Sequence, residues 1–359
     1  MPIKERLPDP LSGIITTADM SESLKLYGIG PDIVVMPLIG QDSHIYAINR
    51  RSQTTKKAFI KHEENFYVLK QLPWYCASEE FANYSTELQH CFSEHGLPVP
   101  DPLKSLDDRR WVKTNGNILT LRNYVHGIEY RRSEEMANQA GLELGRLNHT
   151  TSVIDLSRYR HLFKEDVFGL SRQMIVLLNE FVRRNIRNLT PEDIESLKAF
   201  SDTSERSITN LSDAASTHGY GSLVIPVHGD YNSKNLVFSE NGEVAAVLDF
   251  DNSSFDDVSH DIAEGLLNLS YVRYSEDSTK FDLPDRLDVS IGKSFLDGYD
   301  TSNRHALEES KSRIPSVAAA VLIELLTLGI IRGDYKFSDV KKLTAMPEYV
   351  ESAVKEMLR

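Results

Sequence analysis

The chain has 359 residues, of which 40% are hydrophobic and 26% are charged. Its formal net charge of −13 argues against binding to duplex nucleic acid, because clustered Lys and Arg side chains hold phosphate backbones. The two cysteines, Cys76 and Cys91, lack the paired spacing of a zinc site or a disulfide framework, which favours a reducing, cytoplasmic location.

No membrane partner is expected. The first 13 residues contain neither an apolar stretch nor a cleavage pattern, so they do not resemble a secretion signal. The longest apolar run, residues 317–331, is interrupted by Glu324 and Thr327 and is short for a bilayer span. This run predicts a buried helix.

The N-terminal third predicts a small α+β unit. Short runs rich in β-branched and aromatic residues predict antiparallel strands at residues 33–38, 44–49, 66–72, around Trp111 and at 118–125. Residues 78–94 have helical spacing, with Ser78 as a start signal and His95-Gly96 as a stop signal. Residues 1–125 are therefore expected to form an N-terminal lobe with a five-stranded antiparallel sheet and one helix.

The remainder of the chain, residues 126–359, predicts a mostly helical C-terminal lobe. Helical periodicity begins near residue 133, Thr190-Pro191 is a strong helix start, and His218-Gly219 is a helix end. Strand patterns return only between residues 223 and 250. The fold class is therefore expected to be α+β with two lobes, a small antiparallel-sheet N-lobe and a mostly helical C-lobe.

The strongest chemical signal is HGDYNSKN at residues 228–235, followed by AAVLDFD at 245–251. Asn241-Gly242 is a favoured hairpin turn, so residues 235–239 should fold back on residues 243–249. That register places Asn235 opposite residue 248, to within about one position. One end of the hairpin then presents both Asn235 and Asp249.

These side chains suit phosphoryl transfer. An amide oxygen from Asn235 and carboxylates from Asp249 and Asp251 are hard oxygen ligands of the kind that Mg²⁺ accepts together with nucleotide phosphates. Asp230 lies five residues before Asn235, where its carboxylate can accept or orient the proton of an incoming hydroxyl. The pattern predicts an enzyme that uses a magnesium nucleotide.

HGD-x4-N, LDFD and the D-x-x-x-DIA of residues 257–263 together resemble the superfamily of aminoglycoside phosphotransferases, homoserine kinases and choline kinases. The catalytic lobe of these enzymes is similar to that of protein kinases. The resemblance covers about residues 33–270 and implies a protein-kinase-like fold, ATP or GTP, Mg²⁺ and a small hydroxyl acceptor. It implies that Asp230 is the catalytic aspartate, that His228 braces the loop and that Asn235 and Asp249 bind magnesium. Asp261 would be structural and tie the loop to the following helix.

The N-terminal lobe carries the matching nucleotide contacts. Lys70 in FYVLKQL resembles the phosphate-orienting lysine of the family. LTLRNYVHG resembles the hinge that binds adenine through backbone groups, here Arg122, Tyr124 and Val125. Gly40 and Ser43 lie in IGQDSHIY at the position of the phosphate-covering turn, which is richer in glycine in the family than in this chain.

Two assignments have alternatives. Glu87 shares a helix face with Glu80 and Tyr84 and is the preferred partner of Lys70, but an alignment without gaps places Ser85 there. Lys234 lies inside the catalytic loop, where it could contact the transferred phosphate or be an ordinary surface lysine.

The acceptor is expected to be a small molecule, and a cationic one is favoured. Residues 239–300 contain fifteen Asp or Glu against four Lys or Arg, and this excess of acids attracts cations. Candidate contacts for an amine are Asp251, Asp256, Asp257 and Glu264. The chain is expected to act as a monomer or a homodimer.

The main alternative is a catalytically inactive pseudokinase or a nucleotide-binding regulatory protein. Lys70, Asp230, Asn235 and Asp249 argue against it, because an inactive relative could lose any of them without unfolding. A hydrolase lacks support because neither G-x-S-x-G nor H-E-x-x-H occurs, and a protein kinase lacks D-F-G and A-P-E.

Overall fold

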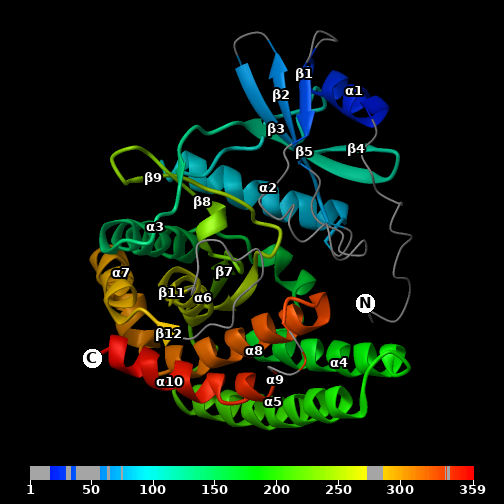
Figure 1. Cartoon of the computed structure of the whole chain (residues 1–359). Helices are drawn as coiled ribbons and strands as arrows, with labels where there is room; N and C mark the ends of the chain where they lie inside the picture. The colour runs from blue at the N-terminus through cyan, green and yellow to red at the C-terminus, as the bar shows by residue number, and fades with distance from the viewer. Residues whose placement is uncertain are drawn as a thin grey trace. The chain divides into compact units, whose positions relative to one another are not determined.

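The chain divides into two compact units, Met1–His126 (unit 1) and Gly127–Arg359 (unit 2), whose elements are labelled in Figure 1. The computed structural model describes residues 17–29, 34–37, 57–62, 65–73, 76–272, 286–335, 337 and 340–359.

Unit 1 is built on one antiparallel sheet. Its strands are β1 (Val34–Pro37), β2 (Lys57–His62), β3 (Asn65–Gln71), β4 (Val112–Thr114) and β5 (Asn117–Asn123), in the order β1-β2-β3-β5-β4. Four of these strands match predicted ones. The predicted strand at 44–49 lies outside the described residues, and β2 was not predicted. A first helix, α1 (Thr17–Leu26), was also missed.

The predicted helix of unit 1 is confirmed as α2 (Glu79–Glu94). The Ser78 side chain accepts a hydrogen bond from the Phe81 N–H at 3.1 Å, which caps one of the unpaired donors at the helix start. The helix ends at His95, and Gly96 follows with φ +72°, a left-handed conformation that glycine adopts without steric cost. The Trp111 indole N–H, just before β4, donates to Asn83 Oδ1 of α2 at 2.8 Å and so links the helix to the sheet.

Unit 2 is mostly helical, as predicted. Its helices are α3 (Glu134–Val153), α4 (Val167–Asn185), α5 (Pro191–Thr217), α6 (Ser259–Ser270), α7 (Val289–Ser310), α8 (Ile314–Arg332), α9 (Val340–Leu343) and α10 (Met346–Met357), with 3₁₀ turns at Ser157–Leu162 and Ser233–Asn235. The start at Thr190 is a full capping box: Thr190 Oγ1 accepts from the Asp193 N–H, and Asp193 accepts from the Thr190 N–H, both at 3.1 Å.

Short strands carry the polar loops of unit 2. The pairs are β6 (Ile128–Glu129) with β8 (Leu236–Phe238), β8 with β9 (Val244–Val247), β7 (Val224–Val227) with β10 (Ser254–Asp257), and β11 (Tyr271–Val272) with β12 (Arg286–Leu287), all antiparallel. Leu236 lies opposite Val247, and the Leu248 N–H donates to the Asn235 carbonyl at 2.8 Å. The predicted hairpin register is therefore confirmed.

The core of unit 2 surrounds α8, which packs against α4, α5, α6 and α10 (Figure 1). Among the described residues, α8 is the one helix long and apolar enough to cross a membrane, judged by length and composition alone. Yet 78% of its most apolar window is buried inside the protein, which is the pattern of a core helix. The buried helix predicted from residues 317–331 is confirmed.

Helices α3 and α7 cross in very close contact. A Cβ atom added to Gly141 of α3 would lie 1.9 Å from the carbonyl oxygen of Phe295, and one added to Gly298 of α7 would lie 1.9 Å from that of Asn138. The two backbones therefore touch at these glycines, which fixes the position of α3 against the remainder of unit 2.

Candidate active site

The HGDYNSKN segment forms a loop between β7 and β8, and the backbone of this loop is fixed by one aspartate. Asp261 of α6 accepts the N–H of His228 at 2.9 Å and that of Gly229 at 3.0 Å. Asn148 of α3 donates to the same carboxylate at 2.9 Å. Gly229 has φ +71°, and a Cβ there would lie 2.3 Å from the Asn252 carbonyl, so only glycine fits. Asp261 has the structural place that the family resemblance implied.

His228 connects this loop to the end of the hairpin. Its Nδ1 accepts the N–H of Asp230 at 3.2 Å, so its proton is on Nε2, which donates to the Leu248 carbonyl at 2.9 Å. The ring is buried and packs on Phe250, with 4.6 Å between ring centroids. These contacts are those of a loop brace, and both ring nitrogens are occupied in making them.

The Asp230 carboxylate is held by two amide groups. Its Oδ1 accepts from Asn232 Nδ2 at 2.6 Å, and its Oδ2 accepts from Asn235 Nδ2 at 2.9 Å. Burial and the nearby Asp249 carboxylate raise the pKa of Asp230 to about 7, although the two amides and Lys234 act in the opposite direction. A carboxylate with fixed orientation and a pKa near neutrality is suited to exchange a proton with a hydroxyl.

Asn235 and Asp249 lie at the same end of the hairpin, as predicted. The Asn235 amide nitrogen is used by Asp230, and in the described part of the chain its Oδ1 accepts no hydrogen bond. Asp249 has φ +70°, a conformation that non-glycine residues rarely adopt and that often occurs at functional sites. Asp251, two residues further on, is buried.

This donor set fits a hard cation. An amide oxygen that accepts no hydrogen bond from the described residues and two carboxylates within three residues supply only oxygen atoms, which suits Mg²⁺ or Ca²⁺. Among the described residues, no group of three or more His, Cys, Asp or Glu side chains is arranged to hold a metal. The fit therefore rests on the mixed amide and carboxylate set, in which water and phosphate oxygens would complete the coordination.

Asp256 was expected to contact an amine, and this prediction is wrong because both of its oxygens are used inside the protein. Oδ2 accepts from the Val167 N–H and from His260 Nδ1, both at 2.9 Å, and Oδ1 accepts from the Tyr220 hydroxyl at 2.5 Å. Burial opposes the charged form of His260, but Asp256 and the nearby acids Glu264 and Asp261 raise the pKa of His260 to about 10. Asp256 and His260 therefore form a buried ion pair.

The same prediction is wrong for Asp257. Its Oδ1 accepts from Arg313 Nε at 2.8 Å and from the Ser259 hydroxyl at 2.7 Å, and its Oδ2 accepts from the Gly221 N–H at 2.8 Å. The side chains of Asp257 and Arg313 are 0% and 1% exposed, so this ion pair is completely buried. Of the four candidate amine contacts, Asp251 and Glu264 are left.

Lys234 is exposed on the 3₁₀ turn that leads into β8. Its backbone N–H donates to Asn232 Oδ1 at 2.9 Å, and its charge acts on both Asp230 and Asp334. Its predicted contact with a phosphate stays a prediction.

In unit 1, Lys70 lies on β3 opposite Thr120 of β5, with 2% of its surface exposed. Glu87 is partly buried on α2, and Ser85 is buried, with its hydroxyl accepting from Gln89 at 3.1 Å. The pairing of Lys70 with Glu87, or with Ser85 in its place, stays a prediction. Gly40 and Ser43 lie outside the described residues.

The predicted hinge follows β5. The Arg122 guanidinium is buried and donates to Thr120 at 3.4 Å, so this side chain belongs to the interior of unit 1. The Tyr124 N–H donates to the Phe66 carbonyl at 2.9 Å. The Val125 N–H makes no hydrogen bond within the described residues, and its predicted contact with adenine stays a prediction.

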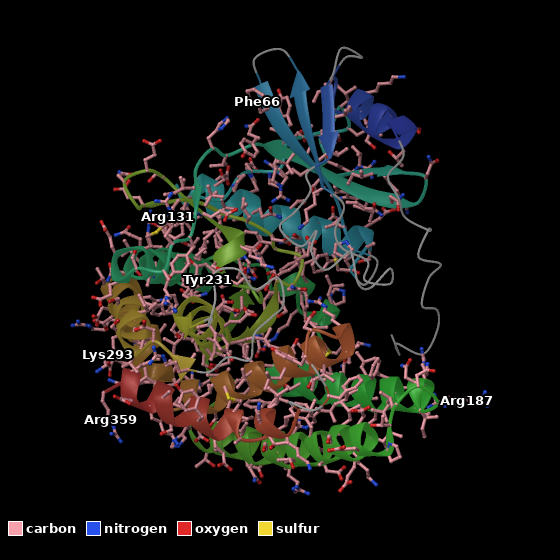
Figure 2. All side chains as sticks on the ribbon, viewed as in Figure 1. Phe66, Arg131, Arg187, Tyr231, Lys293 and Arg359 are labelled. Carbon is pink, nitrogen blue, oxygen red and sulfur yellow. The ribbon has the colours of Figure 1, made fainter. Side chains whose placement is uncertain are left out.

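Several residues of the site were missed in the sequence. Asn232 could have been found, because an amide two residues after an aspartate often bonds to it locally. Asn148 offers no local signal, since it meets Asp261 from 113 residues away. Tyr231 is fully buried in unit 2, where Figure 2 labels it, and its hydroxyl donates to the Ala140 carbonyl at 2.8 Å.

The fold is found in solved structures of small-molecule kinases. Amicoumacin kinase hAmiN, in complex with AMP-PNP, Ca²⁺ and Ami, is 15% identical, with 92% of this chain and 90% of that one covered and a TM-score of 0.57. The aminoglycoside phosphotransferase from Alicyclobacillus acidocaldarius is 13% identical, with 90% and 96% covered and a TM-score of 0.59. The microcompartment-associated aminopropanol kinase is 12% identical, with 95% and 97% covered and a TM-score of 0.59.

These likenesses confirm the predicted α+β, two-lobed, protein-kinase-like fold. No curated protein matches the chain in sequence. The family model described as the phosphotransferase enzyme family matches residues 55–283, which is more than half of the chain and includes the loop, the hairpin and α6. The chain therefore belongs to the phosphotransferase enzyme family.

Proposed function

We propose that this chain is an ATP-dependent small-molecule kinase that transfers the γ-phosphoryl group to a hydroxyl, with Asp230 as the catalytic base. One observation carries the proposal. The Asn235 amide directs its nitrogen to the Asp230 carboxylate, and Asp249 follows the strand opposite Asn235, so the proton acceptor and the candidate cation ligands share one hairpin end. Solved structures of the same fold with AMP-PNP and Ca²⁺, or with ADP, support a nucleotide as cosubstrate and a divalent cation as cofactor.

In the proposed mechanism, Asp230 accepts a hydrogen bond from the acceptor hydroxyl and takes its proton as the new phosphorus–oxygen bond forms. The bond between the γ-phosphorus and the β,γ-bridging oxygen of ATP breaks, and ADP leaves. Asn232 and Asn235 keep the carboxylate pointed at that hydroxyl, which places the reacting atoms for in-line attack. A magnesium ion, when bound, would neutralise charge on the nucleotide phosphates and would be held by Asn235, Asp249 and Asp251. For unit 1 taken by itself, Lys70 is proposed to bind nucleotide phosphates and the Val125 N–H to bind adenine.

An amino alcohol, or another amine-bearing alcohol, is the proposed class of acceptor. The acidic balance of residues 239–300 favours a cation electrostatically. Proteins with the same fold are named for aminopropanol, ethanolamine and aminoglycosides, which all carry an amine beside a hydroxyl.

The test is a panel of amine-bearing and neutral alcohols assayed with MgATP or MgGTP, with release of nucleoside diphosphate as the readout. Asp230→Asn should lower kcat by about 10²–10⁴-fold while MgATP affinity stays close to that of the parent, because the change removes the proton acceptor and keeps the shape. Asp213→Asn, on the exposed face of α5, is the matched control and should keep parental rates. Binding of MgATP without turnover of any acceptor would instead favour an inactive, nucleotide-binding pseudokinase.

A further inference from the structure

Four consecutive backbone N–H groups of the catalytic loop, those of residues 228–231, donate to side chains. Asp261 takes the first two, at 2.9 and 3.0 Å, and His228 Nδ1 takes that of Asp230, at 3.2 Å. The fourth, the N–H of Tyr231, donates to Glu264 Oε2 at 2.9 Å. Glu264 lies one helical turn after Asp261 on α6, so both carboxylates project from the same face of that helix.

The peptide unit between Asp230 and Tyr231 is held at both of its edges. Its N–H is bound by Glu264, while its carbonyl oxygen accepts from Asn235 Nδ2 at 2.9 Å and from Asn232 Nδ2 at 3.2 Å. Because a peptide unit is planar, fixing its two polar edges fixes the rotation of the plane. The Cα of Asp230 borders this plane, so the direction of the Asp230 side chain depends on both contacts.

The same amides that hold the carbonyl also hold the carboxylate. Asn232 and Asn235 bind the Asp230 backbone oxygen and its side-chain oxygens together. If the peptide plane rotated, the carbonyl would move away from these amides and the carboxylate contacts would change with it. Glu264 is the described side chain that opposes this rotation from the N–H edge.

Glu264 is well placed for such a role. It is 7% exposed, and among the described residues its Oε1 accepts no hydrogen bond, so the Tyr231 amide is its sole side-chain partner. Tyr231 itself is anchored at the far end of its side chain, since its hydroxyl donates to the Ala140 carbonyl. The residue after the catalytic aspartate is therefore held at its backbone by α6 and at its ring by α3.

From this geometry we infer that Glu264 is a positioning residue, which fixes the Asp230–Tyr231 peptide and so directs the Asp230 carboxylate toward the acceptor. The inference rests on the proposed function for its catalytic consequence. Its structural part concerns the Tyr231 amide alone and can be tested without any turnover.

The structural test is hydrogen exchange at the Tyr231 amide in the full chain. Glu264→Ala removes the acceptor, so this amide should exchange faster than in the parent, whereas Glu264→Gln keeps a carbonyl oxygen and should keep slow exchange. Glu143→Ala is the matched control, because Glu143 is equally buried but accepts from Arg146 at 2.7 Å. Exchange at Tyr231 that is unchanged in Glu264→Ala would overturn the inference, whatever the activity of the chain.

The catalytic test separates kcat from KM with MgATP and an acceptor that the parent uses. Glu264→Ala should lower kcat by about 10–100-fold with KM for MgATP unchanged, because a small misplacement of a reacting group is costly. Glu264→Gln should recover most of kcat. If Glu264→Ala does not fold, Glu264→Asp can replace it. Its side chain is one methylene shorter, so this variant should show a smaller loss of kcat.

The amine-contact role predicted for Glu264 gives a different result. If Glu264→Gln raised KM for an amine acceptor about tenfold while kcat and the Tyr231 exchange stayed parental, Glu264 would bind the acceptor and the positioning role would be wrong. A parent chain that turns over no acceptor would count against the proposed function, and the exchange experiment would still decide the inference.

Discussion

At the scale of single residues, the carboxylates of unit 2 serve different tasks despite their closeness in sequence. Asp230 and Asp249 lie on the loop and the hairpin end, whereas Asp256, Asp257 and Asp261 bind groups inside the protein. Each internal carboxylate takes three or more hydrogen bonds, which offsets the cost of burying its charge. Residue type alone therefore does not separate catalytic acids from structural ones.

The buried ion pair between Arg313 and Asp257 predicts a loss of stability when Arg313 is replaced. Arg313→Leu should lower the free energy of unfolding by about 3–5 kcal/mol, because it leaves the Asp257 charge buried without its partner. Urea denaturation of the variant and the parent measures the difference. Arg304→Leu, which breaks a surface pair with Asp300 on α7, is the control and should change stability little. Equal losses in the two variants would contradict the buried pair.

Whether the role of a residue could be predicted from the sequence depended on how far along the chain its contact partners lie. Asn235 and Asp249 were placed together because Asn241-Gly242 fixes the register over a few residues. Asp256 was misassigned because, although His260 is four residues on, its partners Tyr220 and Val167 lie 36 and 89 residues away. Asp257 was misassigned because Arg313 lies 56 residues away. Local spacing contains no information about such contacts.

At the scale of elements, helix boundaries were predictable where capping chemistry was local. Ser78 and Thr190 each cap a helix through their own side chains. Strand β2 was missed because its apolar centre, Ala58-Phe59-Ile60, is only three residues long and is flanked by Lys and His. Pairing with β1 and β3 on either side makes this segment a strand, and a single segment does not reveal its neighbours.

The crossing of α3 and α7 gives a prediction at this scale. Alanine in place of a helical glycine usually stabilises a helix by about 0.5–1 kcal/mol. Gly141→Ala should instead destabilise the protein by about 1–3 kcal/mol or more, because the new methyl group would overlap the Phe295 carbonyl and push the helices apart. The midpoint of thermal unfolding measures the effect.

The control for Gly141→Ala is Gly169→Ala in α4. Its added methyl group meets chiefly the Glu165 side chain, which is exposed and can move. This variant should be neutral or slightly more stable than the parent. If Gly141→Ala were as stable as Gly169→Ala, the result would contradict the close backbone contact between α3 and α7.

At the scale of the whole molecule, the chain is two compact units with a strongly acidic balance. Ligands that bind only the folded state stabilise it in proportion to the logarithm of their concentration. MgATP at about 100 times its dissociation constant should therefore raise the free energy of unfolding by about 2.7 kcal/mol. The midpoint of thermal unfolding should rise with MgATP concentration.

Adding a chelator to the unfolding experiment distinguishes the contribution of the divalent ion from that of the nucleotide. If a divalent ion holds the nucleotide at the hairpin end, EDTA should remove most of the rise in the unfolding midpoint. The reason is that ATP alone adds negative charge beside Asp230 and Asp249. MgCl₂ without nucleotide is the control and should give a much smaller shift. A full shift with ATP in EDTA would exclude the proposed cation site.

The place of α8 at the centre of unit 2 has a consequence for biosynthesis. The helix spans residues 314–332 of 359, but it covers surfaces of α4, α5 and α6 that leave the ribosome much earlier. Those surfaces are apolar and stay open to solvent, or to chaperones, until α8 has been synthesised. Unit 1 has its last strand by residue 123 and can begin to fold on the nascent chain, whereas the core of unit 2 forms only once α8 has left the ribosome.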